Sequence, residues 1–185
     1  RRAAIDVPEE VLAVLRTPQP EIPAPEVTLL ANGLDAARGV ASVVPGPVEV
    51  RSDWLTGSVA PCLQRFFDEA GTGVTVGAGE TVLEVTGEGR GGRNTHAALL
   101  AATRIAGTND VFVAFATDGV DGASGSAGAV VDGGTVSRGG DPSPALDSFD
   151  SAGYLEASSD LLRCSPTGTN VSDIWILWRR EPLAT

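Results

Sequence analysis

The sequence has no methionine and no lysine, so all 13 of its cationic side chains are arginines. Residue 1 is therefore not expected to be a translational start. The lack of lysine excludes a Walker-type phosphate loop, because the G-x-x-x-x-G-K-[ST] motif requires one. A reaction that needs a lysine would have to obtain it from another part of a protein.

Cysteines, aromatic residues and long apolar runs are also scarce. Cys62 and Cys164 lie far apart and form no C-x-x-C motif, which favours a reduced, cytoplasmic protein. No stretch approaches the roughly 20 apolar residues of a membrane-spanning helix, and no signal peptide is recognisable. Aromatic residues make up only 5% of the chain, so small aliphatic side chains must fill most of its core.

Acidic residues also outnumber basic ones, 24 to 13. The formal net charge is −11, which argues against nucleic acid and anionic membranes as partners. A small anionic ligand would have to be attracted locally, by arginines and by helix N-termini.

The order of the predicted elements indicates an α/β fold with a layered mixed sheet flanked by helices. The 185 residues, 42% of them hydrophobic, suffice for a packed core. The strands at 74–76 and 81–86 are predicted to form an early hairpin around a turn at residues 77–79. Trp175 and Trp178 are expected in the core. Helices are predicted at 8–16, 29–43, 58–70, 94–105 and 151–162, and strands at 48–50, 74–76, 81–86, 111–117, 129–131 and 174–178.

The chain is expected to divide into three parts. Residues 1–28 hold the first helix and a proline-rich, extended connector at 17–25. Residues 29–70 form an α/β segment that leads into the main lobe, and residues 71–185 form that lobe.

The glycine-rich segment between residues 87 and 94 is the first candidate for a binding site. It precedes a predicted helix that Asn94 is expected to cap. Glycines let the backbone approach a ligand closely, a helix start favours an anion, and arginines bind phosphate or carboxylate. The alternative is a tight turn with two solvated arginines. The phosphate- or substrate-binding residues predicted here are Gly89, Arg90, Gly91, Gly92, Arg93 and Asn94.

The same segment offers a second interpretation. Gly87, Gly89 and Gly92 match the dinucleotide fingerprint G-x-G-x-x-G, and Asp118 ends the next predicted strand. The two arginines of the segment would, however, crowd the turn that holds a pyrophosphate. A nicotinamide-binding enzyme is therefore the weaker of the two interpretations.

Two further loops carry candidate residues. Asp118 and Asp121 follow a predicted buried strand, where they could hold Mg²⁺ together with nucleotide phosphates, or accept backbone hydrogen bonds in a turn. Thr167, Thr169 and Asn170 could bind a hydroxy acid or a nucleotide, or form a plain turn.

His96, the only histidine, lies one turn into a predicted helix. At this position it could approach the site. A lone histidine is, however, more often an exposed helix residue.

Three motifs give the sequence a family resemblance. Gly79-Glu80-Thr81 leading into Gly87–Asn94 is similar to the G-G-E-T and G-x-G-x-G-G-R-N signature of the type-2 glycerate kinases. Thr117–Gly122 with Ala127–Ala129 is similar to the family's T-D-G-x-D-G and A-G-A pattern, and Pro166–Asp173 to P-T-G-T-N-V-N-D. Order and spacing agree across residues 79–173, and a weaker likeness reaches back to about residue 18. The chain thus resembles the C-terminal portion of this family, including its MOFRL domain.

The resemblance implies an enzyme that uses ATP and Mg²⁺ to phosphorylate the 2-hydroxyl of D-glycerate, in a cleft between two lobes. It implies a catalytic role for Arg93 beside a lysine of the N-terminal lobe, which has no counterpart in this chain. The implied partners are a glycerate-like substrate, a nucleotide and that missing lobe. The chain alone is not expected to turn over, and the sequence leaves open whether it forms a homo-oligomer.

The sequence also departs from the family pattern. Thr95-His96 stands where the family usually has Gln-Glu, Gly125-Ser126 replaces an acid, and Phe149 begins a segment that is usually Asn-Asp-Ser-Tyr. These changes leave the substrate open. Two alternatives therefore remain: a non-catalytic MOFRL module that binds a ligand or partner, and an NAD(P)-dependent hydroxypyruvate reductase.

Overall fold

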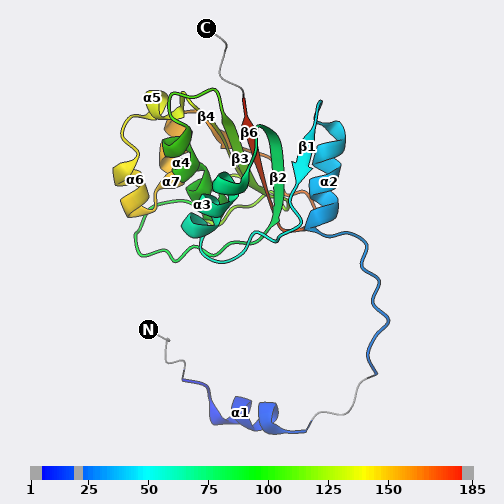
Figure 1. Cartoon of the computed structure of the whole chain (residues 1–185). Coiled ribbons are helices and arrows are strands. Elements are labelled where there is room, and N and C mark those ends of the chain that lie inside the picture. The colour runs from blue at the N-terminus through cyan, green and yellow to red at the C-terminus, as the bar shows by residue number, and fades with distance from the viewer. Residues whose placement is uncertain (1–5, 19–22, 181–185) are drawn as a thin grey trace. The chain divides into compact units, whose positions relative to one another are not determined.

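The computed structural model describes residues 6–18 and 23–180. The chain divides into two compact units, Arg1–Leu30 and Ala31–Thr185. The first unit holds helix α1 (Glu9–Arg16), which matches the predicted helix at 8–16 and has no buried residue (Figure 1). Part of the proline-rich connector predicted at 17–25 lies outside the described residues.

The second unit is built on a six-stranded sheet with the order β1-β2-β6-β3-β4-β5. Only β1 and β2 pair in parallel, and the other neighbours pair antiparallel. The predicted mixed, layered α/β fold is therefore confirmed. The strands are β1 (Val48–Val50), β2 (Gly73–Gly79), β3 (Val111–Ala116), β4 (Gly128–Asp132), β5 (Leu161–Leu162) and β6 (Asp173–Arg179).

The predicted early hairpin is wrong. Residues 77–79, interpreted as a turn, continue β2, and residues 81–86 make only a single bridge, between Val82 and Ser58. Gly77 is needed for packing, because a Cβ there would come within 2.8 Å of the Phe66 ring. The sheet is mixed for another reason: β6, from the far end of the chain, inserts between β2 and β3.

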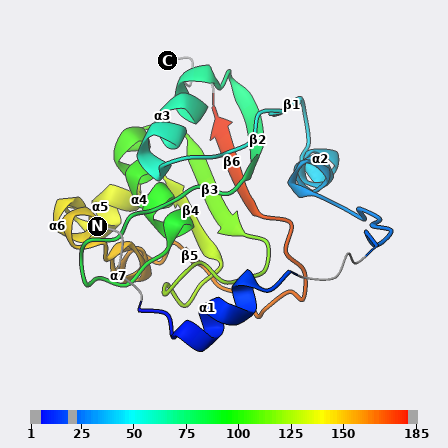
Figure 2. The same ribbon diagram turned by 90° about the horizontal axis from the view of Figure 1, so that it is seen from below.

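Helices cover both faces of the sheet (Figures 1 and 2). Successive residues of a strand face opposite sides, and Ile174 and Trp175 of β6 accordingly belong to two different core clusters. Helix α2 (Gly33–Val43) packs on β1 and β2 over the Ile174 cluster. Helices α3 (Val59–Glu69) and α4 (Arg93–Ile105) lie over the larger Trp175 cluster.

Trp178 corrects a prediction. Trp175 is fully buried, as predicted, but Trp178 is about half exposed, with the Arg180 guanidinium 4.7 Å from its ring centroid. The alternation of β6 places Trp178 on the same face as Ile174 and Ile176, next to the last residue of the strand.

Local hydrogen bonds decide where helices begin. Helix α2 starts at residue 33 and not at the predicted residue 29, because Asn32 and Asp35 form a reciprocal capping box at its N-terminus.

The predicted helix at 151–162 is shorter in the structure. Helix α7 (Ser151–Ala157) ends where Ser159 adopts a left-handed backbone, and the following residues form β5. Two short helices, α5 (Thr135–Gly139) and α6 (Ser143–Ser148), were not predicted. Among the described residues, no helix has the length and apolar character that crossing a membrane requires.

Candidate functional site

The three motif segments meet at one end of the sheet, the lower end in Figure 1 and the end that faces the viewer in Figure 2. There β2 ends at Gly79, β3 ends at Ala116 and β6 begins at Asp173, and the register places Asp173 between the other two. The loops that follow β2 and β3 also touch, because Ala123 donates a backbone hydrogen bond to Gly91. Sequence order alone could not show this convergence, because β6 comes from the end of the chain.

The N-terminus of α4 already holds a carboxylate. Both oxygens of the buried Asp121 accept backbone hydrogen bonds, from Asn94 at 2.9 Å and from Thr95 at 2.8 Å. A Cβ on Gly92 would collide with this carboxylate. The negative charge that a helix start favours is thus supplied from within the chain.

This arrangement changes the role of Asn94. Helix α4 begins at Arg93 with Gly92 as N-cap, so the prediction that Asn94 caps the helix is wrong. The Asn94 amide instead donates to Asp121 and accepts a hydrogen bond from the indole of Trp175, at 3.1 Å. It is fully buried and ties the helix start to the centre of the sheet.

Arg93 lies at the wall of the site with two carboxylate partners. Its Nε and Nη2 donate hydrogen bonds to the two oxygens of Asp173, at 2.6 and 3.0 Å. Its Nη1 forms an ion pair with Glu80 at 3.1 Å. A third of the Arg93 side chain remains exposed.

Burial and ion pairing have opposite effects on the pKa of Asp173. Burial raises the pKa of this carboxyl group above its ordinary value, although the hydrogen bond and the charge of Arg93 act in the opposite direction. The same hydrogen bond raises the pKa of Arg93. An unpaired charge at Asp173 would be costly, so the two residues depend on each other.

Arg90 and the glycines before it contact protein. Arg90 forms an exposed ion pair with Glu156, and its backbone N–H donates to Asp150 at 3.0 Å. A Cβ on Gly89 would collide with the backbone of Ser148 and Asp150. The glycines were predicted to let the backbone approach a ligand. In the structure they let it approach the turn between α6 and α7.

The remaining predicted residues organise their own loops. The Asp118 carboxylate accepts a hydrogen bond from the backbone of Val120 at 2.9 Å. The Thr167 hydroxyl donates to the carbonyl of Thr117 at 2.6 Å, and the Asn170 side chain accepts from Ser172.

Thr169 belongs to the same local network. Its carbonyl accepts a hydrogen bond from the Thr167 hydroxyl at 3.2 Å. A ligand-binding role for Asp118, Thr167, Thr169 and Asn170 remains a prediction.

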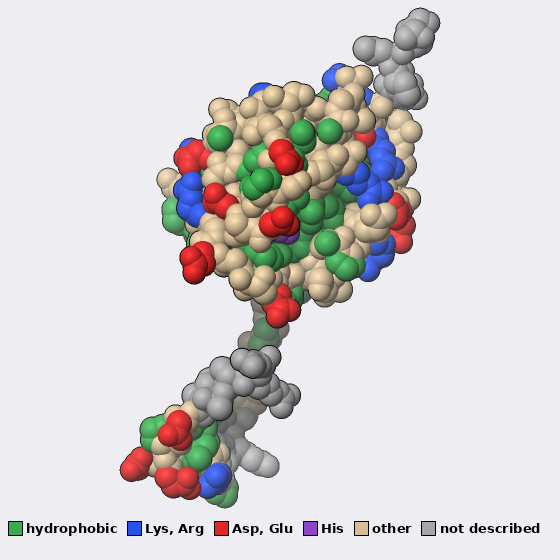
Figure 3. Space-filling view, turned by 90° about the vertical axis from the view of Figure 1, so that its left-hand side faces the viewer, with side chains coloured by type: hydrophobic (Ala, Val, Ile, Leu, Met, Phe, Trp, Pro, Cys, Tyr) green, Lys and Arg blue, Asp and Glu red, His purple; other side chains and the backbone are tan. Residues whose placement is uncertain are grey.

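His96 is buried, against the expectation of an exposed helix residue. Its side chain stacks on Phe149, with ring centroids 5.4 Å apart, and only its edge reaches the surface (Figure 3). Burial lowers its pKa. Both residues are departures from the glycerate kinase pattern, and here they contact each other.

An open groove of about 750 Å³ runs along this end of the sheet. Arg93 is the cation and Glu80 the anion among its lining residues. The glycine loop forms one wall, and residues 81–83 together with Val85 form another. The lining residues are Glu80, Thr81, Val82, Leu83, Val85, Gly89, Gly91, Gly92, Arg93, Gly122 and Ala123.

A model of the MOFRL family matches residues 73–173, which is more than half of the chain. The chain belongs to the MOFRL family. This match covers β2, α4 and the loops that form the groove, and it ends at Asp173, the buried partner of Arg93.

The MOFRL domain is similar to enzymes of known name. The chain is 46% identical over 103 residues to a D-glycerate 2-kinase of Thermotoga maritima, a match that covers 53% of this chain and 25% of that relative. A protein of Agrobacterium vitis named putative hydroxypyruvate reductase is 31% identical over 198 residues, which cover 94% of this chain and 45% of the relative.

A solved structure extends the likeness. The crystal structure of glycerate kinase from Thermotoga maritima matches with a TM-score of 0.77 and 31% identity, over 95% of this chain and 47% of that chain. The chain is thus a glycerate kinase-like C-terminal domain, and it spans less than half the length of these relatives.

Two residues of the site were not assigned from the sequence. Asp173 closes the third motif and is the first residue of a buried strand. A buried acid is rarely left unpaired, so its position is a signal for a partner of opposite charge. Glu80 follows β2, but its position was obscured because the strand was predicted to turn at residue 77.

Proposed function

We propose that the chain is the C-terminal portion of a glycerate 2-kinase-like phosphotransferase, which transfers the γ-phosphoryl group of ATP to the 2-hydroxyl of D-glycerate. The observation that carries this proposal is the placement of Arg93. It belongs to the G-G-R-N motif, its guanidinium is oriented by Asp173, and it lines an open groove of the size of a small-molecule site.

Arg93 suits an anionic substrate. A guanidinium presents paired donors that match a carboxylate or a phosphate group. Asp173 fixes two of its nitrogens, which leaves Nη1 directed toward Glu80 in the groove. In this proposal Arg93 binds either the carboxylate of D-glycerate or the phosphoryl group during transfer.

Arg93 is the one cation among the described residues that line the groove. Phosphoryl transfer requires positioned positive charge around the transferring group, and this sequence contains no lysine. We therefore propose that an N-terminal lobe, in the part of the relatives that this chain does not cover, completes the active site, and that the assembled protein is cytoplasmic.

Mg²⁺ bound with the nucleotide would neutralise negative charge on the phosphates. Asp121 does not fit a metal-binding role, because both of its oxygens already accept hydrogen bonds from the first turn of α4. Asp118 fits better, because its carboxylate accepts a hydrogen bond from one backbone N–H, that of Val120. Mg²⁺ needs few protein ligands when phosphate oxygens and waters complete its shell, so we propose Asp118 as the metal-facing carboxylate.

The reductase alternative has less structural support. A dinucleotide fingerprint requires a strand directly before its glycines and a free helix start behind them. Residues 81–86 are not a strand, and the start of α4 is occupied by Asp121. The name of the Agrobacterium vitis relative nevertheless makes NADH a necessary probe.

Assays of the 185-residue chain and of the full-length gene product test the proposal. We expect D-glycerate or ATP–Mg²⁺ to bind the chain, ATP-dependent glycerate kinase activity of the chain to stay at background, and the full-length protein to turn over. Robust turnover by the chain alone would contradict the need for a second lobe. Binding of NADH without binding of ATP–Mg²⁺ or D-glycerate would replace the kinase with the reductase, and a full-length protein that binds without turnover would indicate a non-catalytic module.

A further inference from the structure

The two carboxylates that contact Arg93 differ in burial and geometry. The Asp173 side chain is 2% exposed and accepts hydrogen bonds from two guanidinium nitrogens. The Glu80 side chain is 59% exposed and forms an ion pair at 3.1 Å with the third nitrogen, Nη1. One arginine thus has a buried partner and an exposed partner at the same time.

The position of each acid in the sheet explains this difference. Asp173 is the first residue of β6 and pairs in register with Gly79 and Ala116, so strands flank it on both sides. Glu80 follows the last residue of β2 and lies at the rim of the groove. The backbone therefore restrains Asp173, while the Glu80 side chain can rotate into solvent.

The energetic consequences also differ. An exposed ion pair contributes little to stability, because water and salt screen it and both side chains lose freedom when it forms. A buried carboxylate that loses its cation pays the full cost of desolvation. An anion that enters the groove can therefore replace Glu80 at Arg93, but it cannot replace Asp173.

We propose that these two carboxylates have separate tasks. Asp173 is a positioning residue that fixes the Arg93 guanidinium, and Glu80 is an internal anion that occupies Nη1 until a ligand carboxylate or phosphate displaces it. The identity of the ligand rests on the proposed function, whereas the exchange itself rests on the geometry of the three side chains.

Displacement of Glu80 reduces the apparent affinity of any anion for Arg93, because ligand and side chain compete for one position. From the usual strength of an exposed ion pair, we expect Glu80→Gln to tighten anion binding about two- to fivefold. Glu84→Gln is the matched control, since it removes one negative charge from an exposed position of the same segment.

The experiment follows the Nε–H signal of Arg93 by NMR in the ¹⁵N-labelled 185-residue chain, with Arg93→Lys used to assign that signal. Inorganic phosphate and D-glycerate are titrated separately at low ionic strength. We expect phosphate to shift the signal in the wild-type chain, and the midpoint to fall two- to fivefold in Glu80→Gln but not in Glu84→Gln. Equal midpoints for the two variants, or no phosphate-dependent shift in any variant, would overturn the role of Glu80.

Asp173→Asn tests the positioning role in the same titration. We expect the Arg93 Nε–H signal to move toward the position of a solvated arginine, and phosphate binding to weaken by tenfold or more. An unchanged signal and midpoint would overturn this role. Should Asp173→Asn fail to fold, Asp173→Glu, which keeps the charge but shifts the carboxylate, is used with the same two readouts.

The two probes separate this inference from the proposed function. If phosphate displaces Glu80 but D-glycerate shifts nothing, the exchange is supported and the proposed substrate is wrong. If D-glycerate binds with the same midpoint in the wild-type chain and in Glu80→Gln, the substrate class is supported and the exchange is overturned.

Discussion

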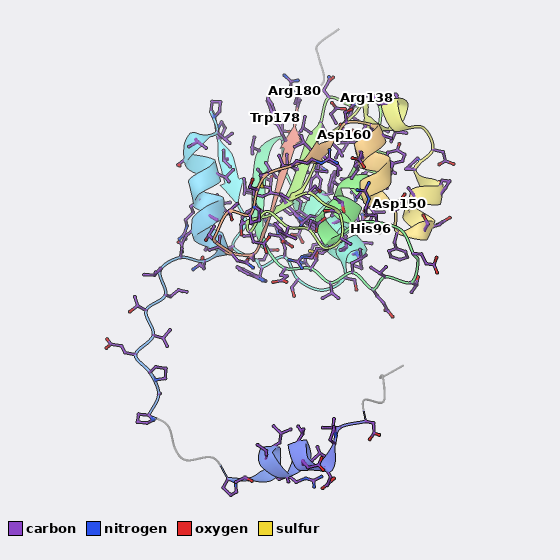
Figure 4. The ribbon with its side chains drawn as sticks, turned by 180° about the vertical axis from the view of Figure 1, so that it is seen from behind. His96, Arg138, Asp150, Asp160, Trp178 and Arg180 are labelled. Atoms are coloured by element: carbon purple, nitrogen blue, oxygen red, sulfur yellow. The ribbon has the colours of Figure 1, made fainter. Side chains whose placement is uncertain are left out.

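Arg93 and Arg138 lie at opposite ends of the sheet and provide an internal comparison. Arg93 binds Asp173 at the start of β6, which is the loop end of the sheet. Arg138 lies with the buried Asp160 at the other end, on the side of Trp178 and Arg180 (Figure 4). Each arginine binds one buried carboxylate at 2.6 Å: Asp173 for Arg93, and the 8% exposed Asp160 for Arg138.

The two arginines differ in the contacts of their exposed carboxylate partners. At the far end, Asp132 is 49% exposed, yet it accepts a hydrogen bond from Arg138, and the remaining Arg138 nitrogens donate to Ser158 and Thr135. At the loop end, the third nitrogen of the arginine meets Glu80 in an ion pair beside the groove. Each guanidinium nitrogen of Arg138 donates a hydrogen bond to the protein, whereas Nη1 of Arg93 has an exposed partner that a ligand can exchange.

The largest expected effect on stability concerns two aspartates, one at each end of the sheet, that accept backbone hydrogen bonds. Asp121→Ala leaves buried N–H groups at the start of α4 without an acceptor, so we expect a loss of about 2–4 kcal/mol in the free energy of unfolding. Asp132→Ala removes an exposed acceptor, and we expect about 1 kcal/mol or less. Urea denaturation measures both, and a larger loss for Asp132→Ala would reverse the comparison.

The arginines themselves give the next largest effect. Arg93→Ala and Arg138→Ala each leave a buried carboxylate unpaired, so we expect each to destabilise the fold by about 1–3 kcal/mol, a value reduced because both arginines are partly exposed. Only Arg93→Ala should abolish phosphate binding. Calorimetric titration with inorganic phosphate measures binding in both variants, because Arg93→Ala has no Arg93 Nε–H signal to follow.

Arg38→Ala serves as the control for these variants. Arg38 forms an exposed pair with Asp35 at 3.5 Å, and its removal should change stability by less than about 0.5 kcal/mol. Loss of phosphate binding in Arg138→Ala would show that the two ends of the sheet are not independent.

The smallest expected effect is the pH dependence of stability that comes from His96, at the loop end of the sheet. Burial lowers the pKa of His96 below its ordinary value of 6.5, so the folded state favours the neutral ring. The unfolded chain binds more protons between the two pKa values. The stability linked to His96 is therefore complete above about pH 6.5 and is lost as the pH falls toward the lower, native pKa.

We expect His96→Gln to flatten this dependence by about 1 kcal/mol or less between pH 7.5 and 5.5. Urea midpoints of the wild-type chain and the variant at both pH values measure the difference. Parallel pH profiles would mean that His96 titrates alike in the folded and unfolded chains.

Much of the fold was predictable because it depends on local patterns. The apolar run at 111–117 indicated a buried strand, and the helices at 59–69 and 93–105 were predicted to within one residue at each end. The hairpin was mispredicted because a glycine in a strand and a glycine in a turn look alike in sequence. Only the packing of Phe66 against Gly77 shows which role applies.

The three motifs and their order were enough to identify the family and to point to Arg93. The partner that each charged group takes became known only from the folded chain. Asp121 accepts backbone hydrogen bonds at the start of α4, and Asp173 binds Arg93. The physical reason is that β6 inserts between β2 and β3, bringing an acid 80 residues away in sequence beside the arginine. Such a pairing depends on strand order and burial, which no local pattern records.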